Sequence, residues 1–329
     1  MIGCGDSPPV VPSDYGIDQG QLDTDGGIGD AHVVVADGPA SHDVLLDAPI
    51  PKCPEFKSPT TAAQINIAQI DEASGLAFSR SNADILWVHN DSGDKPRFFA
   101  LRSDGTLAAT YRLSGINAQD WEDMAAGPGP AAGKNYLYLG DIGDNAEKRA
   151  SIVVHRVEEP AVAAGLEGTT VDLDTFESFQ FKYPGGAHNA ETLIVDPITA
   201  DLYIVTKKSD GKSKVFRAAA PLNSSGTTTL EDVADLDFTS GALSSATVKL
   251  TTGGDVTPDG SVVAVRTYTE AFFWPRMPGT PLHAAFSEAP CFKTLALEPQ
   301  GETLAFSADG QGFYTLSEKT DQPLYYYAQ

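Results

Sequence analysis

The sequence is poor in basic residues and has no long apolar runs. It contains 22 Lys and Arg residues against 45 Asp and Glu residues, which gives a formal charge of −23. Nucleic-acid binding needs a basic surface, so this charge argues against it and instead favours solubility and cation binding. The apolar stretches are short and lie between clusters of Gly, Pro, Asp and Ser, a pattern typical of strands and turns rather than of long helices.

Several catalytic signatures are also missing. The sequence has no G-x-S-x-G phrase, no paired Cys/His phrase and no Walker spacing around the glycine in the phrase at 210–212. Three histidines lie in the region of the predicted core, at His89, His155 and His188. His188 precedes an acidic phrase at Glu191 and is the candidate general base near a metal. The alternative is a packed, hydrogen-bonded histidine.

What the sequence does contain is a repeat in which an acidic residue heads each of five short apolar phrases. The five residues are Glu72, Glu122, Glu191, Asp255 and Glu302. A second strand follows each phrase, reading ILWVHND, YLYLGDIGDN, LYIVTKKS, VVAVRTYTE and GFYTLSEKT. A third, mostly aromatic strand comes next, reading RFFAL, SIVVHRV, KVFRAA, AFFWPR and LYYYAQ. Repeated units of this kind indicate a β-propeller.

We therefore predict an all-β fold, a β-propeller with five blades. The segment 218–250 is loosely patterned, so six or seven blades stay open. Blade five lacks a fourth strand, and the alternating segment 64–70 is predicted to supply it and close the ring, which also removes an exposed edge. The fourth strands of the other blades are predicted at AATYRL, FESFQFKY, VADLDF or ATVKL, and HAAFSE.

The N-terminal region differs in composition from the rest. Residues 1–60 contain ten Asp or Glu residues but only two Lys residues, and they show no strand or helix period, so we predict a disordered tether before a propeller domain at 61–329. Cys4 follows a small residue, as in the lipidated cysteine of bacterial lipoproteins, although the apolar stretch of a signal peptide is missing and a chance match stays open. On this basis we expect an extracytoplasmic protein, either a cell-surface or outer-membrane lipoprotein or a secreted protein.

The two remaining cysteines would meet if the ring closes. Cys53 lies just before the first strand and Cys291 just before the last blade. An exported protein could oxidise the pair to a disulfide, and two unrelated thiols are the alternative.

The five acidic residues are predicted to point toward the axis of the ring. Carboxylates that converge need a counter-charge, and hard oxygen ligands without clustered His or Cys select Ca²⁺. The predicted ligands are Glu72, Glu122, Glu191, Asp255 and Glu302, with Asn90 and Asn189 in support. The alternative is that each acid caps a strand by accepting backbone N–H bonds.

Polar loops between the second and third strands are expected on the same face. The phrases 91–94 and 141–144 share a D-x-G-D pattern, which suits either a calcium loop or a tight turn. Basic residues of these loops are candidates to bind a small anionic ligand, with salt bridges to the acids as the alternative. They are Arg97, Arg149, Lys207, Lys208 and Arg266.

The phrases ExSGLA, HNDSGD, DWEDMA, LYLGDIGDN and PQGETLAF resemble those of a group of secreted bacterial propellers without an assigned activity, over about residues 66–329. The chain also resembles, more weakly, the soluble calcium-activated nucleotidases, or apyrases, which are five-bladed propellers. Glu72, Glu122, Glu191 and Glu302 match the layout of that family, which implies one axial Ca²⁺. His188 is separated from Glu191 by two residues, and Lys207 and Lys208 stand in place of an Arg-Arg phrase.

Two functions follow from these observations. The first is a monomeric, calcium-binding propeller that serves as a ligand-binding or scaffold protein. The alternative is a calcium-dependent hydrolase of phosphate or lactone esters, with its site on the axial rim.

Overall fold

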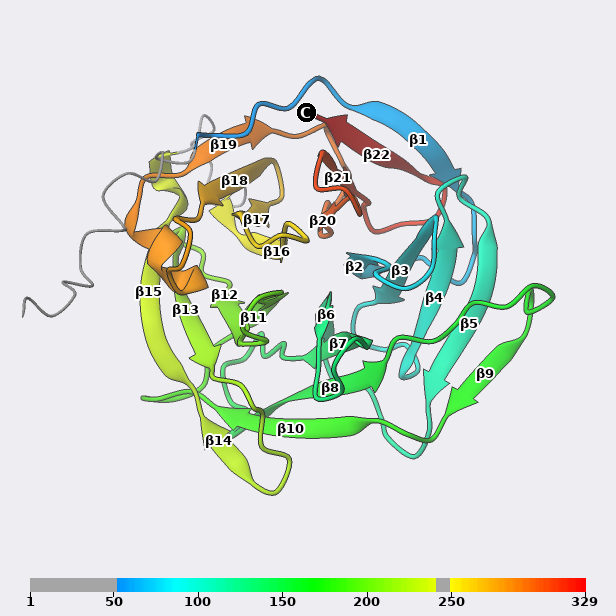
Figure 1. The fold of residues 1–329 in the computed structure, drawn as a ribbon, viewed down its shortest axis with the longest axis horizontal. Coiled ribbons are helices and arrows are strands. Elements are labelled where there is room, and N and C mark those ends of the chain that lie inside the picture. The colour runs from blue at the N-terminus through cyan, green and yellow to red at the C-terminus, as the bar shows by residue number, and fades with distance from the viewer. Residues whose placement is uncertain (1–51, 241–248) are drawn as a thin grey trace, which may run out of the picture. The chain divides into compact units, whose positions relative to one another are not determined.

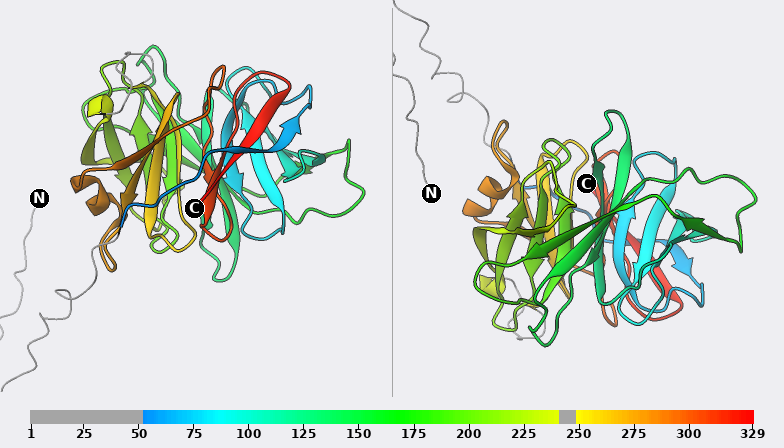
Figure 2. Two further views of the ribbon diagram at one scale, coloured as in Figure 1. Left: turned by 90° about the horizontal axis from the view of Figure 1, so that it is seen from above. Right: turned by 90° about the horizontal axis from the view of Figure 1, so that it is seen from below.

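The structure, a computed structural model, describes residues 52–240 and 249–329. Five antiparallel-based sheets surround a common axis, as Figure 1 shows, and each sheet forms one blade. The predicted five-bladed β-propeller is therefore confirmed. Cys4 and most of the predicted tether lie outside the described residues. In the side views of Figure 2 the blades stand next to one another with their strands running between the same two faces of the ring.

Blades 1 and 2 each have five strands. From the axis outwards, blade 1 consists of β2 (Ala73–Phe78), β3 (Ile85–Asn90), β4 (Arg97–Arg102), β5 (Leu107–Leu113) and β9 (Thr170–Leu173). Blade 2 consists of β6 (Trp121–Pro128), β7 (Asn135–Asp141), β8 (Ile152–Glu158), β10 (Glu177–Lys182) and β14 (Thr227–Thr229). The outermost strands β9 and β14 come from long loops and pair in parallel, and they extend the two blades beyond the predicted four strands.

The other three blades have four strands each. Blade 3 consists of β11 (Ala190–Val195), β12 (Leu202–Thr206), β13 (Lys212–Ala218) and β15 (Glu231–Asp237). Blade 4 consists of β16 (Thr251–Val256), β17 (Val262–Thr267), β18 (Glu270–Pro275) and β19 (Cys291–Thr294). Blade 5 consists of β20 (Ala305–Phe306), β21 (Gly312–Thr315), β22 (Gln322–Ala328) and β1 (Thr60–Ile65).

The ring closes as predicted, because the N-terminal strand β1 completes blade 5 by pairing with β22. The strand lies earlier than the segment 64–70 and runs from Thr60 to Ile65. Its register, from Thr60 opposite Tyr326 to Ile65 opposite Gln322, places Ala63 and Ile65 in the core. The apolar residues after Ile65 belong instead to the turn that leads into blade 1.

One fourth strand was predicted at the wrong place. The phrase HAAFSE belongs to a 3₁₀ helix, η3 (Leu282–Ser287), which packs Leu282 and Phe286 into the core between blades 3 and 4. The fourth strand of blade 4 is β19. In the described part of 218–250 the chain forms β14, β15 and the 3₁₀ turn η1 (Phe238–Ser240), and these elements belong to existing blades or follow them.

A disulfide and an aromatic contact fasten the chain ahead of β1. Cys53 and Cys291 are joined, so the predicted pairing is present in the structure. Phe56 packs against Phe273 and Phe313, with ring centroids 4.7 and 4.8 Å apart. The backbone N–H of Lys57 donates to the carbonyl of Ala328 at 2.7 Å. Residues 53–57 therefore bind to blades 4 and 5.

The core consists of five apolar clusters. They lie between neighbouring blades and are made by aliphatic and aromatic side chains of the facing sheets. Among the described residues no helix is long and apolar enough to cross a membrane.

Candidate metal centre

The inner strands carry a β-bulge at the same place in successive blades. The pairing with the second strand shifts by one residue near the start of β2, β6, β11 and β16. In blade 5, Glu302 occupies the matching place, next to an isolated bridge between Gly301 and Ser317. The five equivalent residues, here called the bulge positions, are Ser74, Glu122, Glu191, Thr252 and Glu302. Bulges redirect side chains and are frequent next to functional sites.

A second set of equivalent residues lies at the same face. The second strand of each blade runs antiparallel to the first, so the residue after it returns to the face where the inner strand begins. These post-strand positions are Asp91, Ile142, Lys207, Tyr268 and Glu318. The backbone N–H of Asp91 donates to the carbonyl of Glu72 at 2.8 Å, and that of Lys207 donates to the carbonyl of Asn189 at 2.9 Å. Each blade therefore presents two side chains at this face.

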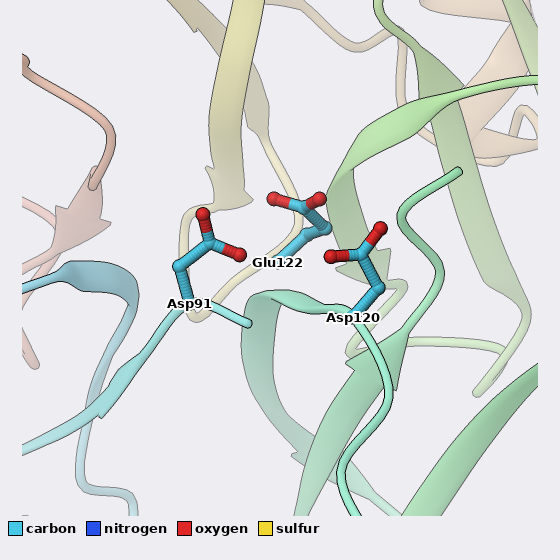
Figure 3. Close-up of side chains that lie close together, drawn as sticks. All are labelled: Asp91, Asp120 and Glu122. Atoms are coloured by element: carbon cyan, nitrogen blue, oxygen red, sulfur yellow. The ribbon is translucent and has the colours of Figure 1, made fainter. Parts of the chain in front are cut away.

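Four acids of the two sets and Asp120, which directly precedes β6, come together, and we call these five carboxyl groups the axial acid cluster. Its members are Asp91, Asp120, Glu122, Glu302 and Glu318. Carboxylate oxygens of Asp91, Asp120 and Glu122 lie within 4.8 Å of one another, and Figure 3 shows these three side chains side by side. Oxygens of Asp91, Glu302 and Glu318 satisfy the same limit. Blades 5, 1 and 2 supply all five groups.

Two buried members of the cluster have carboxylate oxygens that accept no hydrogen bond from a described residue. Glu122 is 2% exposed, and no described residue donates a hydrogen bond to its carboxylate. Glu302 is 3% exposed, and its Oε2 atom has no partner among the described residues. A buried charge without a partner is costly, so these carboxylates must be protonated or must face a cation.

The electrostatics of the cluster disfavour ionisation in the absence of a cation. Burial raises the pKa of Glu122 well above its usual range, and the neighbouring Glu191 and Asp91 raise it further. Burial also raises the pKa of Asp91 to about 6, with Glu302 adding to the effect and the Ser92 N–H opposing it. Burial and the adjacent Glu302 raise the pKa of Glu318 to about 8. Bound cations reverse such shifts.

A glycine allows the backbone to approach the acids of blade 2. A Cβ atom added at Gly143 would overlap the carboxylates of Glu122 and Asp120. The backbone N–H of Gly143 donates to the carbonyl of Asp120 at 3.1 Å, which holds the Gly143 loop against the cluster. The glycine of the second D-x-G-D phrase thus serves close packing beside the site.

Blades 3 and 4 present a different chemistry at the same face. Glu191 forms an ion pair with Lys207, and both side chains are largely buried. The Lys207 ammonium group donates to the hydroxyl of Tyr268 at 3.2 Å, and that hydroxyl donates to Glu302 at 3.3 Å. Burial lowers the pKa of Lys207, but Glu191 and Tyr268 outweigh it and hold that pKa above its usual value. Lys207 is therefore a fixed positive charge beside the cluster.

Two predicted ligands lie apart from the cluster. Glu72 is two residues before the bulge position and is exposed, because the bulge residue of blade 1 is Ser74. Asp255 is three residues beyond the bulge position of blade 4. Its carboxylate accepts hydrogen bonds from the backbone N–H groups of Val256 and Phe306, both at 2.8 Å. Asp255 therefore does what the alternative expectation describes and caps strands.

The supporting asparagines also have other partners. Asn90 donates to the carbonyl of Gln69 at 2.8 Å and to Asp94 at 3.1 Å. Asn189 accepts from the N–H of Asp144 at 2.7 Å and lies 3.4 Å from Glu191. The two side chains organise the loops around the cluster.

The five predicted anion-binding residues are all held in ion pairs. Arg97 pairs with Asp94, Arg149 with Asp141, Lys207 with Glu191, Lys208 with Glu147, and Arg266 with Glu298. Arg266 is fully buried and also donates to the carbonyl of Thr303 at 2.7 Å. Of the five, Lys207 lies beside the acids through Glu191, and Arg149 lies near Asp120 and donates to the carbonyl of Gly143 at 2.8 Å. An anion site built from all five has no support in the geometry.

His188 lies against aromatic rings. Its ring is 5.1 Å from that of Tyr183 and 5.3 Å from that of Phe216, measured between centroids. Burial lowers the pKa of His188, and Lys208 lowers it further. This environment fits the packed histidine of the alternative expectation.

Asp91, Asp120 and Glu318 are absent from the ligands predicted from the sequence. Asp91 and Glu318 lie in phrases that the sequence assigns to turns or polar loops, although Asp91 directly follows β3 and Glu318 follows the bridge residue Ser317. The D-x-G-D interpretation as a turn holds for Asp94, which accepts from the N–H of Lys95 at 2.7 Å, while Asp91 faces the cluster. A sequence pattern could have identified Asp91 and Glu318 as ligands: each is an acidic residue that comes just after the second strand of a repeated unit.

No protein-family model matches the sequence, and no curated protein matches it. Among solved structures, the chain is similar to a crystal structure of RRP9 WD40 repeats, with a TM-score of 0.37 and 12% sequence identity. That match covers 78% of this chain and 66% of the other, slightly less than two thirds of its length. The resemblances to secreted bacterial propellers and to apyrases stay predictions. The five-bladed β-propeller is established by the sheet topology itself.

Proposed function

We propose that this protein is a calcium-binding β-propeller that serves as a ligand-binding or scaffold protein. The observation that carries the proposal is a pair of buried carboxylates, Glu122 and Glu302, which face other carboxylates. Among the described residues, none donates a hydrogen bond to the Glu122 carboxylate or to Oε2 of Glu302. A bound cation removes the cost of burying them. The propeller fold by itself is compatible with many functions, so the proposal depends on this site.

Calcium is the cation that fits the donor set. The cluster offers carboxylate oxygens from three blades, and no His or Cys belongs to either described group of ligands. Hard oxygen donors select Ca²⁺ or Mg²⁺, and Ca²⁺ accepts six to eight oxygens in flexible geometry. Ligands that come from separate blades suit the more tolerant ion.

A binding role is better supported than hydrolysis. A calcium-dependent hydrolase of phosphate or lactone esters would need a base near the metal and free cations for the substrate. The candidate base, His188, packs against Tyr183 and Phe216, and the predicted cations are engaged in ion pairs. We therefore propose that calcium organises a binding face.

We also propose an extracytoplasmic location. The Cys53–Cys291 disulfide supports it, because such bonds persist in oxidising compartments and are rare in the cytosol. Soluble extracellular calcium is also abundant enough to fill sites of modest affinity.

The test is a calcium titration followed by thermal melting of the chelator-treated protein. Ligand at one hundred times its Kd stabilises the folded state by about 2.7 kcal/mol, so we expect calcium to raise Tm by several degrees. Glu122→Gln should reduce this gain. Glu158→Gln is the matched control, since Glu158 is exposed and pairs with Lys134 at 2.6 Å. If millimolar calcium leaves the Tm of the wild type unchanged, the proposal is wrong.

A further inference from the structure

The axial acid cluster consists of two trios that share one residue. Asp91 belongs to both groups of mutually close carboxylates, with Asp120 and Glu122 on one side and with Glu302 and Glu318 on the other. The two outer pairs come from different blades, blade 2 and blade 5, and they are not grouped with each other within the same 4.8 Å limit. The carboxylates are therefore arranged around two places rather than one.

Each trio contains its own buried acid with an oxygen that accepts no hydrogen bond from a described residue. In the first trio this is Glu122, and no described residue hydrogen-bonds to its carboxylate. In the second it is Glu302, whose Oε1 accepts from Tyr268 and Gln300 while Oε2 has no partner among the described residues. Glu122 and Glu302 belong to different trios, so these two buried carboxylates point to two separate positive charges. A cation next to Glu122 alone would leave Oε2 of Glu302 unsatisfied.

The net charge of the axial acid cluster and its neighbours also favours two bound cations over one. The five cluster carboxylates and Glu191 carry six negative charges when ionised, and Lys207 and Lys319, which pair with Glu191 and Glu318, supply two positive charges. One divalent cation would leave the group negative, whereas two would bring it to neutrality. A carboxylate has two oxygens and can bridge metal ions that lie about 3.5–4 Å apart.

We propose that this face binds two calcium ions, with Asp91 as the bridging ligand. The proposal rests on the proposed function and adds its stoichiometry and ligand assignment. Asp120 and Glu122 complete the protein ligands of the first ion, which joins blade 1 to blade 2. Glu302 and Glu318 complete those of the second ion, which joins blade 1 to blade 5.

The second ion lies where blade 5 meets the chain entering blade 1. The backbone N–H of Lys319, next to Glu318, donates to the carbonyl of Asp71 at 2.7 Å. Blade 5 is also the blade that β1 completes, so it contains the non-covalent closure of the ring. Calcium at the second site would add a cross-link between blades 5 and 1 at the axial end.

The test measures how many calcium ions bind. Native mass spectrometry of the chelator-treated wild type, titrated with calcium, should show two bound ions, and isothermal titration should give the same stoichiometry. Asp120→Asn and Glu318→Gln should each lower the stoichiometry to one, and the double variant should bind none. Asp91→Asn should weaken both sites by at least about tenfold, the loss expected when a charged ligand is removed. Glu158→Gln should still bind two ions.

The outcomes separate this proposal from the one on which it depends. One ion in the wild type, lost equally in Asp120→Asn and Glu318→Gln, would overturn the two-ion arrangement and leave a calcium-binding propeller. No bound calcium in the wild type would overturn both proposals. The wild-type stoichiometry needs no variant, so it decides the question even if a substitution impairs folding. Circular dichroism of each metal-free variant identifies any that fail to fold.

Discussion

The Asp123 carboxylate on the inner strand of blade 2 accepts a hydrogen bond from the backbone N–H of Gly254, on the inner strand of blade 4, at 3.2 Å. The same oxygen accepts from the N–H of Leu193 in blade 3 at 2.9 Å, and the other oxygen accepts from the N–H of Met124 at 2.8 Å. Inner strands have no neighbour on the axial side, so their free N–H groups need another acceptor. Asp123 supplies it for three blades.

Asp123→Ala should destabilise the protein strongly. The substitution leaves three buried N–H groups without an acceptor, and each such group costs roughly 1–3 kcal/mol, so we expect a loss of at least about 3 kcal/mol. Asp123→Asn keeps one acceptor oxygen and should cost less. Urea unfolding of the two variants measures the difference. Equal stability of Asp123→Ala and the wild type would show that solvent replaces these bonds.

Arg266→Met should act on stability rather than on ligand binding. Arg266 and Glu298 form an ion pair at 2.9 Å with side chains that are 0% and 1% exposed, so removing one partner leaves a buried charge. Such a loss costs roughly 3–5 kcal/mol. Arg102→Met is the control, because its partner Glu167 is half exposed and exposed pairs contribute at most about 1 kcal/mol. Similar urea midpoints for the two variants would contradict the assignment.

Loss of the Cys53–Cys291 disulfide should lower Tm. The bond spans 238 residues, and removal of a native disulfide typically costs about 2–5 kcal/mol. Cys53→Ser, Cys291→Ser and the double variant should melt at the same lower temperature, since each loses the same bond. Alkylation of the unfolded, unreduced wild type followed by mass spectrometry should find Cys4 as the one free thiol. Three free thiols would contradict the disulfide.

His155 should make stability depend on pH in the acidic range. Burial lowers the pKa of His155 to about 4, and its ring accepts from or donates to Ser178 at 2.8 Å. The unfolded chain, with an ordinary histidine pKa near 6.5, binds the proton more readily, so stability is fully present above that pH and is lost as the pH falls toward 4. The loss amounts to roughly 3 kcal/mol at most.

The comparison with His155→Gln isolates this effect from the carboxyl groups that titrate in the same range. Urea unfolding at several pH values between 7 and 4, in the presence of chelator, should show a steeper loss for the wild type than for the variant. Parallel curves would mean that His155 does not gain a proton on unfolding.

Much of the fold was predictable because the repeat is strong. The second and third strands of all five blades are at the predicted places, since alternating or continuous apolar phrases bounded by turn residues determine strands locally. The closure of the ring by the N-terminal strand followed from the number of strands in each repeated unit, because the last unit had three strands instead of four. The strand predicted at HAAFSE shows that an apolar sequence pattern does not always distinguish a strand from a short helix. Its apolar residues Leu282 and Phe286 are buried, but on a 3₁₀ helix rather than on a strand.

The candidate site was only partly predictable. Glu122, Glu191 and Glu302 share a bulge position, while Glu72 and Asp255 look equivalent in the sequence but are displaced by two and three residues along their strands. A bulge adds a residue to one strand without a reliable sequence signature. The acidic residue at the head of each repeated apolar phrase therefore cannot be assigned to the axis from the sequence alone.

The sequence by itself favoured five blades over six or seven, and it indicated the order of their strands, the closure of the ring and the accumulation of acidic residues on one face. These features depend on local strand and turn patterns and on the repeat. The tertiary structure decided which acids meet. Asp91, Glu122 and Glu318 come from three blades and converge because strand register and the packing of neighbouring blades set their positions, and neither is encoded in the spacing of a single phrase. The acidic repeat therefore predicts a metal site at the axis, and the register of the strands within each blade determines which acids are its ligands.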